Sequence, residues 1–182
     1  MNDEIWSNIV YPEKPFLSLL NVDPSKNDRV LSVFGWSKTY CLAGLRIGCV
    51  YTTNRQMFDK MIEKSDVMST AGGVSTLSQI AGMASILYGD DWFREFRNHL
   101  TEMRDYGYER LNHMPKLSCT KPEGTYMFYV NIKEYGMNSN EFCEFMKKEV
   151  KLALIPGGEK FFGSQSEGYI RICFATSKEI LE

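Results

Sequence analysis

The chain has 182 residues, of which 43% are hydrophobic, 13% aromatic and 24% charged, and its formal net charge is -2. The apolar fraction is large enough for a real core, which excludes a chain that is disordered throughout. No basic excess points to nucleic acid, and the longest mostly apolar stretch, at 80–88, falls short of the roughly 20 residues that span a membrane. We therefore expect neither nucleic acid nor a membrane as a partner.

The cysteines and histidines suggest no covalent or metal framework. The five cysteines, at positions 41, 49, 119, 143 and 173, show no CxxC spacing, and the acidic first residues lack the apolar core of a secretory signal. We expect reduced thiols, mostly buried, in a cytoplasmic protein. No cluster of Cys, Asp or Glu surrounds His99 or His113, so we expect no metal site.

The predicted elements alternate between strands and helices. Short β-branched and aromatic runs predict strands at 29–34, 45–51, 125–132, 152–155 and 169–174. Apolar stripes predict helices at 54–64, from 75 to about 88, from 90 to about 111, and from 138 to 150. The polar stretch at 21–28 reads as a loop. This mixture predicts an α/β or α+β fold.

Capping residues place the starts of the predicted helices. Asn54 and Ser75 each precede an apolar stripe, and Asp90 or Asp91 precedes the longest one. Asn138 lies three residues before Glu141, which is the spacing of a capping box. In the last predicted helix, Phe142, Phe145, Met146 and Val150 lie on one face, as core residues would.

A lysine and an arginine stand out in the segment 35–48, which joins two predicted strands. Lys38 lies in a small, hydroxyl-rich turn, and Arg46 follows eight positions later between Gly44 and Gly48. A desolvated lysine suits a Schiff base, because burial favours the neutral amine. Arginine beside hydroxyls and glycines suits a phosphate. The alternative is a surface turn with two solvated cations.

This segment resembles the pyridoxal-phosphate lysine motif of the class I/II aminotransferases of fold type I. Gly35, Ser37, Lys38, Leu42, Gly44, Arg46 and Gly48 fit the pattern, and Cys41 departs slightly from it. The resemblance implies pyridoxal 5'-phosphate as the cofactor. It implies that Lys38 is the catalytic lysine that holds the cofactor covalently, and that Arg46 and Ser37 bind its phosphate.

Two further segments agree with the motif in order. Asp3-Glu4-Ile5-Trp6 resembles the strand end whose Asp pairs with the pyridine nitrogen, so the resemblance implies that role for Asp3. Three positions on, the family has a Tyr that contacts the cofactor's phenolic oxygen. Trp6 stands there and can donate one hydrogen bond, although its reach and acidity differ from those of a phenol.

The late strand at 169–174 carries Arg171 among apolar residues, where an unpaired charge is costly. Either an internal carboxylate or a bound one would remove that cost. The stretch resembles the family's strand that bears the substrate arginine, which implies that Arg171 binds the α-carboxylate of an amino acid. Earlier, the glycine-rich segment 69–79 lacks a Gly-Lys-Ser/Thr ending, so we expect a loop and a helix N-cap there.

The resemblance covers the whole chain but not the whole family fold. It implies the end of the large cofactor-domain sheet at residues 1–68, followed by an interdomain helix and most of the small α/β domain at 69–182. We expect a C-terminal portion, because the family's phosphate-binding loop would precede Asp3 and the chain stops inside a helix that starts near Glu179. The full-length protein would then be a homodimer.

Three functions remain open at this point. The first is transamination between an amino acid and a 2-oxo acid, with the present chain inactive alone. The second is pyridoxal-phosphate-dependent β-elimination at a sulfur amino acid, which Trp6 in place of Tyr favours slightly. The third is a non-catalytic folded module that binds a partner.

Overall fold

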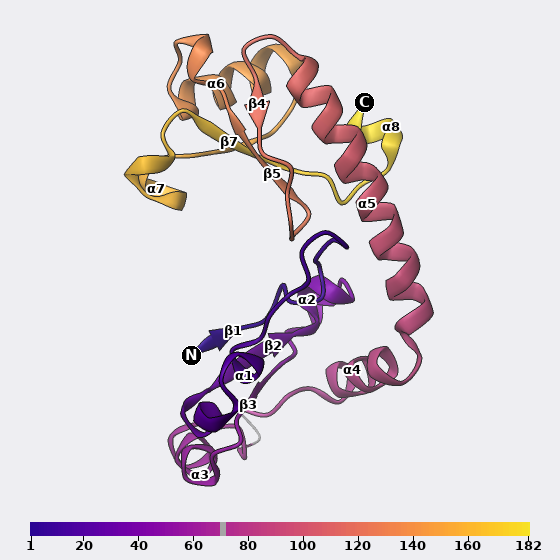
Figure 1. Ribbon diagram of the computed structural model, residues 1–182, viewed down its shortest axis with the longest axis vertical. Coiled ribbons are helices and arrows are strands. Elements are labelled where there is room, and N and C mark those ends of the chain that lie inside the picture. The colour runs from indigo at the N-terminus through magenta and orange to yellow at the C-terminus, as the bar shows by residue number, and fades with distance from the viewer. Residues whose placement is uncertain (70–71) are drawn as a thin grey trace. The chain divides into compact units, whose positions relative to one another are not determined.

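The computed structural model describes residues 1–69 and 72–182 and divides them into two compact units, Met1–Arg97 and Asn98–Glu182 (Figure 1). This grouping differs from the division expected at residues 68 and 69, which stays a prediction. Residues 70 and 71 of the predicted loop at 69–79 lie outside the described residues. Among the described helices, none is both long enough and apolar enough to cross a bilayer.

The first unit is built on a three-stranded sheet of order β1-β2-β3. Its strands are Asn2–Asp3 (β1), Ser32–Gly35 (β2) and Gly48–Tyr51 (β3). β1 runs parallel to β2, with Asp3 opposite Val33, and β2 runs antiparallel to β3, with Gly35 opposite Gly48. The strand predicted at 45–51 therefore starts only at Gly48, because Leu45 lies in a short 3-10 helix and Arg46 is left-handed at φ 51°.

Short helices connect these strands, and one of them corrects a prediction. They are Leu19–Val22 (α1), Pro24–Arg29 (η1), Trp36–Thr39 (α2) and Ala43–Leu45 (η2). The loop predicted at 21–28 was wrong, because most of it is helical. Asp23 caps η1 by accepting a hydrogen bond from the Ser25 N–H at 3.2 Å, and Pro24 fills the first helical position, where proline costs nothing.

The capping residues predicted for the next two helices are confirmed. The helices are Arg55–Lys64 (α3) and Thr76–Tyr88 (α4). The Asn54 side chain accepts a hydrogen bond from the Met57 N–H at 3.0 Å, and Ser75 accepts one from Ser78 at 3.2 Å. These contacts satisfy backbone donors that the first turn of a helix leaves unpaired.

The long helix Asp90–His113 (α5) starts at the predicted residue and ends at His113, slightly later than predicted. The N-cap predicted at Asp90 or Asp91 was wrong, because the Gly89 carbonyl already accepts a hydrogen bond from the Phe93 N–H at 2.8 Å. Both aspartates lie inside the first turn, where their charge interacts favourably with the helix dipole.

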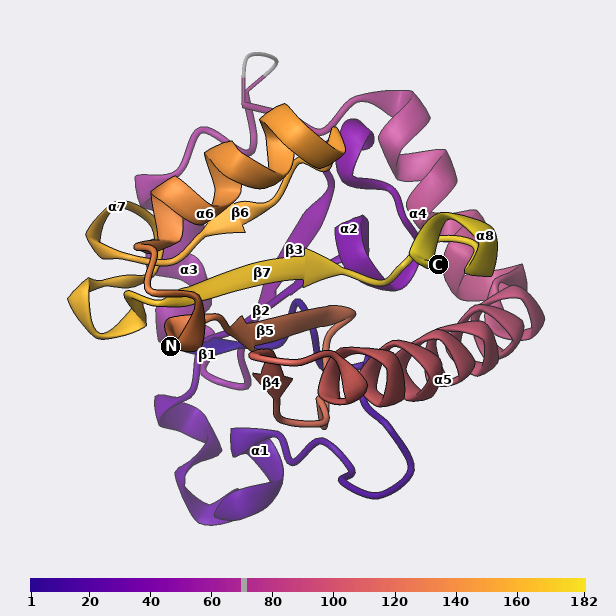
Figure 2. The same cartoon turned by 90° about the horizontal axis from the view of Figure 1, so that it is seen from above.

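The second unit holds a four-stranded antiparallel sheet of order β4-β5-β7-β6 (Figure 2). Its strands are Ser118–Cys119 (β4), Met127–Asn131 (β5), Ile155–Pro156 (β6) and Tyr169–Cys173 (β7). The strand predicted at 152–155 is shorter and later than expected. Its first residues follow Lys151, whose left-handed φ of 63° ends the preceding helix.

Helices and turns of this unit surround the sheet. They are Lys133–Tyr135 (η3), Ser139–Phe145 (α6), Met146–Val150 (η4, a π-helix), Glu159–Phe162 (α7), Ser164–Ser166 (η5) and Lys178–Leu181 (α8). The capping box of Asn138 and Glu141 is confirmed. The predicted apolar stripe is only partly buried: Phe142 is buried, whereas Phe145 and Val150 are exposed. The change to π-helical spacing at Met146 alters the period that the stripe assumed.

One face of the second sheet packs into the core. Phe128, Val130 and Ile170 point to this face and are almost fully buried, and the Phe128 ring packs against that of Phe174, tilted by 40° with 4.5 Å between the centroids. α5 reaches this core through Gly107, where an added Cβ would lie 2.6 Å from the Phe128 ring. The helix therefore needs glycine at the closest approach.

The cysteines are less buried than expected. Cys143 is buried, Cys49 and Cys119 are half-buried, and Cys41 and Cys173 are exposed. All five are unpaired thiols. Most of them lie at strand ends and turns, where the short sheets leave the backbone near solvent.

A buried carboxylate ties β1 to the rest of the first unit. Glu4 is 7% exposed, and it accepts hydrogen bonds from Asn2 Nδ2 at 2.5 Å, from Tyr51 Oη at 2.5 Å and from Ser18 Oγ. Asn2 also donates to Ser32 Oγ at 3.1 Å. Three segments that are distant in sequence thus converge on one carboxylate, which fixes the position of a strand of only two residues.

These contacts shift both acidic groups of the cluster. Burial acts to raise the pKa of Glu4, but the hydrogen bonds from Ser18, Tyr51 and Asn2 outweigh it and leave the pKa below its ordinary value. Burial first, and then the Glu4 carboxylate, raise the pKa of Tyr51 to about 12. The cluster therefore favours an ionised Glu4 and a neutral Tyr51.

We expect Tyr51→Phe to lower the free energy of unfolding at pH 7 by about 1.5–3 kcal/mol, because it removes a hydrogen bond to a charged acceptor. The wild-type stability is complete below the unfolded tyrosine pKa of about 10 and is lost as the pH rises toward 12. Tyr51→Phe removes this alkaline loss. Urea titrations from pH 7 to 12 measure both effects, with Tyr88→Phe, an 82% exposed tyrosine, as the control. An equal alkaline loss in Tyr51→Phe contradicts the assignment.

We also expect Gly107→Ala to lower the free energy of unfolding by about 1–3 kcal/mol, because the new methyl group would overlap the buried Phe128 ring. Without that clash, alanine in a helix is more stable than glycine. Gly44→Ala is the matched control, since its Cβ meets nothing within 4 Å. Chemical denaturation compares the two variants, and a stabilised Gly107→Ala chain would disprove the close approach.

Candidate functional site

The residues singled out in the first unit meet at one edge of its sheet. Asp3 ends β1, and α2, which carries Lys38, begins where β2 ends. Arg46 lies two residues before β3. β1 and β2 are parallel and β3 is antiparallel, so the carboxyl ends of β1 and β2 and the amino end of β3 share an edge. Ligands of sheets with parallel strands bind beyond such carboxyl ends.

Lys38 extends from α2 toward the turn that follows β1. The side chain is half-buried, and its Nζ lies 5.0 Å from the centroid of the Trp6 ring. Among the described residues, no carboxylate lies within ion-pair distance of this ammonium. The Lys38 amine thus has an aromatic neighbour, and the surface turn with two solvated cations stays an alternative for this segment.

Arg46 and Ser37 could bind an anion at this edge. Arg46 is exposed and adopts a left-handed backbone conformation, φ 51° and ψ 45°, which is uncommon for a residue with a Cβ. Its amide donates to the Ala43 carbonyl at 3.4 Å, which closes the η2 turn. Ser37 is half-buried in the first turn of α2. A guanidinium and a hydroxyl are donors that suit a phosphate.

Asp3 presents a carboxylate at the end of β1, as the sequence predicted. Its Oδ1 accepts a hydrogen bond from the Ile5 N–H at 3.0 Å, and the side chain is exposed. This contact fixes the carboxylate in the turn that leads to Trp6. A fixed, accessible carboxylate can accept a hydrogen bond from a protonated ring nitrogen.

Two buried donors near Lys38 lack partners within the described part of the chain. They are Thr39 Oγ1, in a residue that is 0% exposed, and Trp36 Nε1. Unsatisfied buried groups are rare in native proteins. Trp36 Nε1 lies 3.9 Å from the position of a Cβ added to Gly82 of α4, so it faces that helix. The polar groups at the sheet edge, namely the Lys38 amine, the Arg46 guanidinium, the Ser37 hydroxyl and the Asp3 carboxylate, suit a phosphorylated aldehyde with a basic ring nitrogen.

The other groups next to Lys38 in the sequence are uncharged near neutral pH. Burial, and then the charge of Asp90, raise the pKa of the Tyr40 phenol above its ordinary value. Burial also raises the pKa of the Cys41 thiol. Lys38 is therefore not neutralised by an anionic neighbour on its own turn.

Arg171 lies in the second unit, on β7. The residue is half-buried, and in the sheet it lies opposite Tyr129 of β5 and Ile155 of β6. Its guanidinium carbon is 5.6 Å from the centroid of the Phe162 ring. Within the described residues no Asp or Glu pairs with it, so the internal ion pair considered from the sequence is not formed.

Aromatic rings surround Arg171 on the face of the sheet that does not enter the core. Tyr129 stacks on Tyr169 at 5.0 Å between centroids and meets Phe162 edge-on at 5.7 Å. Phe162 was not predicted as part of a site, although its position in a Phe-Phe-Gly segment after two glycines is visible in the sequence. An arginine without a carboxylate beside such rings can bind a carboxylate that carries an apolar group.

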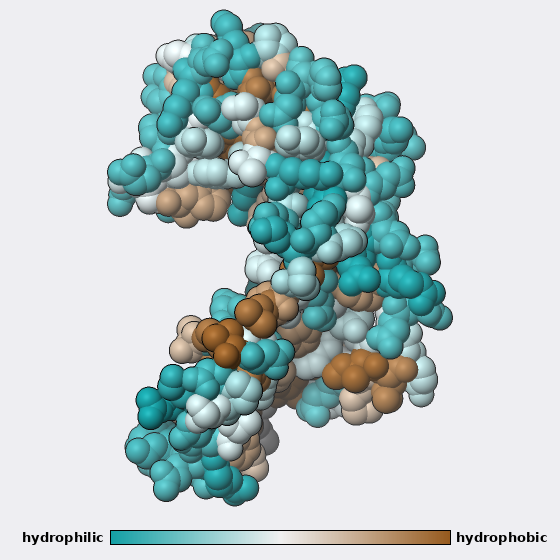
Figure 3. Space-filling view, in the orientation of Figure 1, coloured by the Kyte–Doolittle hydropathy of each residue, from teal (hydrophilic) through white to brown (hydrophobic). Residues whose placement is uncertain are grey.

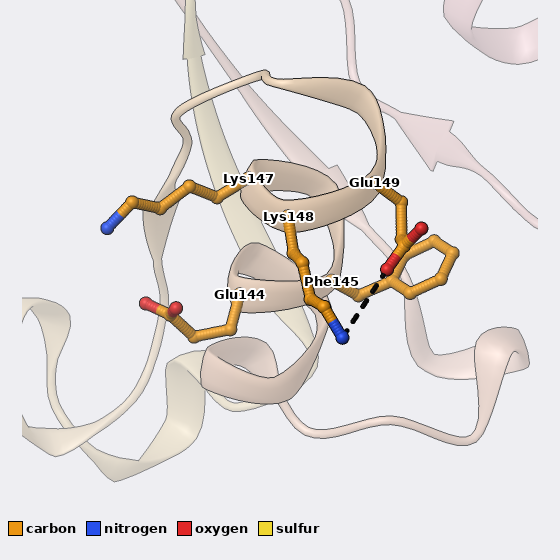
Figure 4. A pocket seen from close by; sticks show the side chains of 5 residues that line it. All are labelled: Glu144, Phe145, Lys147, Lys148 and Glu149. Atoms are coloured by element: carbon orange, nitrogen blue, oxygen red, sulfur yellow. Dashed lines mark ion pairs between the residues drawn. The ribbon is translucent and has the colours of Figure 1, made fainter.

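Two surface depressions lie away from these residues. One, of about 470 Å³, is formed by five residues at the end of α6 and in η4, and an ion pair of 3.7 Å joins Lys148 and Glu149 there (Figure 4). A second, of about 390 Å³, includes Glu4 and Ser18 in the first unit. Neither contains Lys38, Arg46 or Arg171, so the candidate site rests on its donor set and not on a cavity.

The sequence pattern also did not indicate the role of Glu4, which fixes the strand end that carries Asp3. Its signal was weak: an acidic residue directly before the apolar Ile5 and Trp6. The contact that buries it comes from Tyr51, 47 positions away, and no local pattern indicates such a distance.

Comparisons with known proteins indicate the family to which these residues belong. The family described as aminotransferase class I and II matches residues 1–182. The aspartate aminotransferase of Pyrococcus abyssi is 32% identical over 184 residues, which cover 100% of this chain and 46% of that protein. The chain thus spans about half the length of the curated relatives it matches.

Solved structures show the same relationship. The aromatic aminotransferase from Pyrococcus horikoshii OT3 superposes with a TM-score of 0.86 at 31% identity, over 99% of this chain and 47% of that chain. A PLP-bound protein assigned as an aminotransferase from Clostridium difficile 630 superposes with a TM-score of 0.87 at 25% identity, over 98% and 46%.

These matches confirm the mixed α/β fold predicted from the sequence and its relation to fold type I enzymes. They also agree with the expectation of a C-terminal portion, since less than half of each relative is covered. The chain belongs to the pyridoxal-phosphate-dependent aminotransferases of class I and II.

Proposed function

We propose that the full-length protein transfers an amino group between an amino acid and a 2-oxo acid with pyridoxal 5'-phosphate. The observation that carries this proposal is the meeting of Lys38, Arg46 and Asp3 at one edge of the β1-β2-β3 sheet. Membership of the aminotransferase family and the PLP-bound relative support it. The isolated chain, which spans less than half of its relatives, would have little or no activity.

Each residue of this edge would hold one part of the cofactor. Lys38 would form the covalent link through Nζ, and Arg46 with Ser37 would bind the phosphate. Asp3 would accept the hydrogen of the ring nitrogen. When bound, pyridoxal phosphate supplies an aldehyde carbon and a ring that withdraws electrons from the substrate Cα.

Lys38 would also move the proton in the reaction. After the substrate's amino group has displaced Lys38 from the cofactor, the free Nζ would take the proton from the substrate Cα as a general base. It would then deliver that proton to the cofactor's C4′ carbon. Its half-buried position favours this role, because water competes less for the amine. A hydrogen bond from the ring nitrogen to Asp3 would help that nitrogen stay protonated.

Arg171 would orient the substrate. A guanidinium forms two parallel hydrogen bonds with a carboxylate, which fixes the plane of the amino acid as well as its position. Its lack of an internal carboxylate partner among the described residues supports this role. Phe162, at 5.6 Å, would hold the guanidinium from one side.

We infer that the full-length protein is a homodimer in the cytoplasm. The unpaired state of all five cysteines supports this location. One face of α4 exposes large apolar side chains, visible as brown atoms over that helix in Figure 3, and a subunit interface would cover them. These residues are Leu77, Ile80, Met83, Ile86 and Leu87.

We expect pyridoxal phosphate followed by borohydride to label Lys38 selectively in the full-length protein. The reason is that Arg46 and Ser37 would place the aldehyde beside Nζ, whereas the exposed lysines lack such an anion site. Peptide mapping by mass spectrometry measures the distribution of the label. Lys38→Arg keeps the charge and removes the label, and Lys26→Arg, a surface lysine paired with Asp23, is the control. Labelling scattered over many lysines would refute the cofactor site.

We expect Arg171→Lys in the full-length protein to raise the KM for the amino acid and for the 2-oxo acid on the order of 10- to 100-fold. The reason is that lysine cannot form the two parallel hydrogen bonds that a guanidinium makes with a carboxylate. Cofactor absorbance remains, because Arg171 does not belong to the cofactor edge. Steady-state kinetics measure the change, with Arg55→Lys, an exposed arginine on α3, as the control. Unchanged KM values would exclude the substrate role.

A further inference from the structure

The indole ring of Trp6 lies next to the Lys38 amine, in space that water would otherwise occupy. The Nζ of Lys38 lies 5.0 Å from the centroid of the indole ring. An ammonium within about 6 Å of a ring centroid is attracted by the negative face of the ring, and tryptophan gives the strongest such contact. In the described part of the chain this is the one partner found for the Lys38 ammonium.

The backbone around Trp6 forms an ordered turn. The residue lies in the turn directly after β1, where the Ser7 N–H donates to the Glu4 carbonyl at 3.0 Å and the Ile9 N–H donates to the Trp6 carbonyl at 2.9 Å. Ile9 is 1% exposed and anchors the end of this turn. The indole therefore belongs to a structured turn and is half-buried, and it presents an aromatic surface to Lys38.

We propose that Trp6 is a positioning residue that holds Lys38 through the face of its indole ring whenever Nζ carries the proton. This inference rests on the proposed function, in which Lys38 takes the proton from the substrate Cα. Proton transfer turns a neutral amine into an ammonium, and the indole face attracts only the ammonium strongly. Trp6 thus favours the state of Lys38 that follows proton abstraction.

The geometry makes this role different from a hydrogen bond by the indole N–H. A ring that presents its face to Nζ interacts through its π electrons, which phenylalanine also has, whereas an N–H donor is lost in phenylalanine. Replacement by phenylalanine and by leucine therefore separates the two. Both are apolar, but leucine has no aromatic face.

The first experiment measures the contact in the chain without any cofactor. In the wild type, NMR of the Lys38 side-chain protons shows an upfield ring-current shift that is reduced but present in Trp6→Phe and absent in Trp6→Leu. Tyr106→Leu, which removes the aromatic partner of Lys178 at 4.9 Å in the other unit, leaves the Lys38 signals unchanged. A wild-type chain without the upfield shift overturns the inference.

The second experiment uses the full-length protein. We expect Trp6→Leu to lower kcat three- to tenfold, roughly the strength of one partly desolvated cation–π contact, with a larger isotope effect for the Cα-deuterated amino acid. Trp6→Phe keeps kcat within about twofold, and the KM stays near the wild-type value in both, because Arg171 still binds the carboxylate. Equal losses in Trp6→Phe and Trp6→Leu overturn the positioning role and favour the N–H donor.

The two proposals fail in different ways. If borohydride labels Lys38 selectively but leucine and phenylalanine at position 6 behave alike, the proposed function stands and the inference about Trp6 falls. Labelling scattered over surface lysines in the wild type overturns both, since Lys38 would then have no reaction for Trp6 to support. Urea titrations of both variants show whether either one fails to fold, and the wild-type NMR result still decides in that case.

Discussion

The candidate site depends on the parallel pairing of a two-residue strand, β1, with β2. A pair this short has too few backbone hydrogen bonds to be stable by itself. The carboxylate of Glu4 compensates, because it draws together side chains from β1, β3 and the start of α1. A buried charge that lost these donors would be costly, so the cluster is stable only when the strands are correctly placed. Asp3 and the turn of Trp6 take their positions from this constraint.

The two compact units contribute different chemistry. The first holds groups that suit an aldehyde, a phosphate and a ring nitrogen, and the second holds an arginine without a carboxylate partner among the described residues. In the second unit, the alternation along β5 and β7 decides which side chains face the core. Phe128 and Ile170 enter it, while Tyr129 and Arg171 lie on the opposite face. A shift of one residue in this register would bury the guanidinium and expose the core.

Local signals in the sequence predicted local structure well. Asn54, Ser75 and the capping box of Asn138 were readable because each contact spans three residues. The lysine motif was readable because its residues lie within one continuous segment, 35–48, that resembles a known family pattern. Glu4 was not, because its partner Tyr51 is distant in the chain, and neither was the π-helix at Met146, which follows from a change in hydrogen bonding that residue types do not reveal. The unexpected exposure of Cys41 and Cys173 likewise depends on tertiary packing.

The exposed thiol of Cys41 has a consequence for the chemistry of its neighbour Lys38. Two nucleophiles three residues apart would normally compete for an aldehyde reagent. Only the thiolate is a strong nucleophile, and the raised pKa of Cys41 keeps that form scarce near neutral pH. A raised thiol pKa thus reduces competition from sulfur for a carbonyl reagent at this turn, and it also lowers the reactivity of Cys41 toward oxidants that need a thiolate.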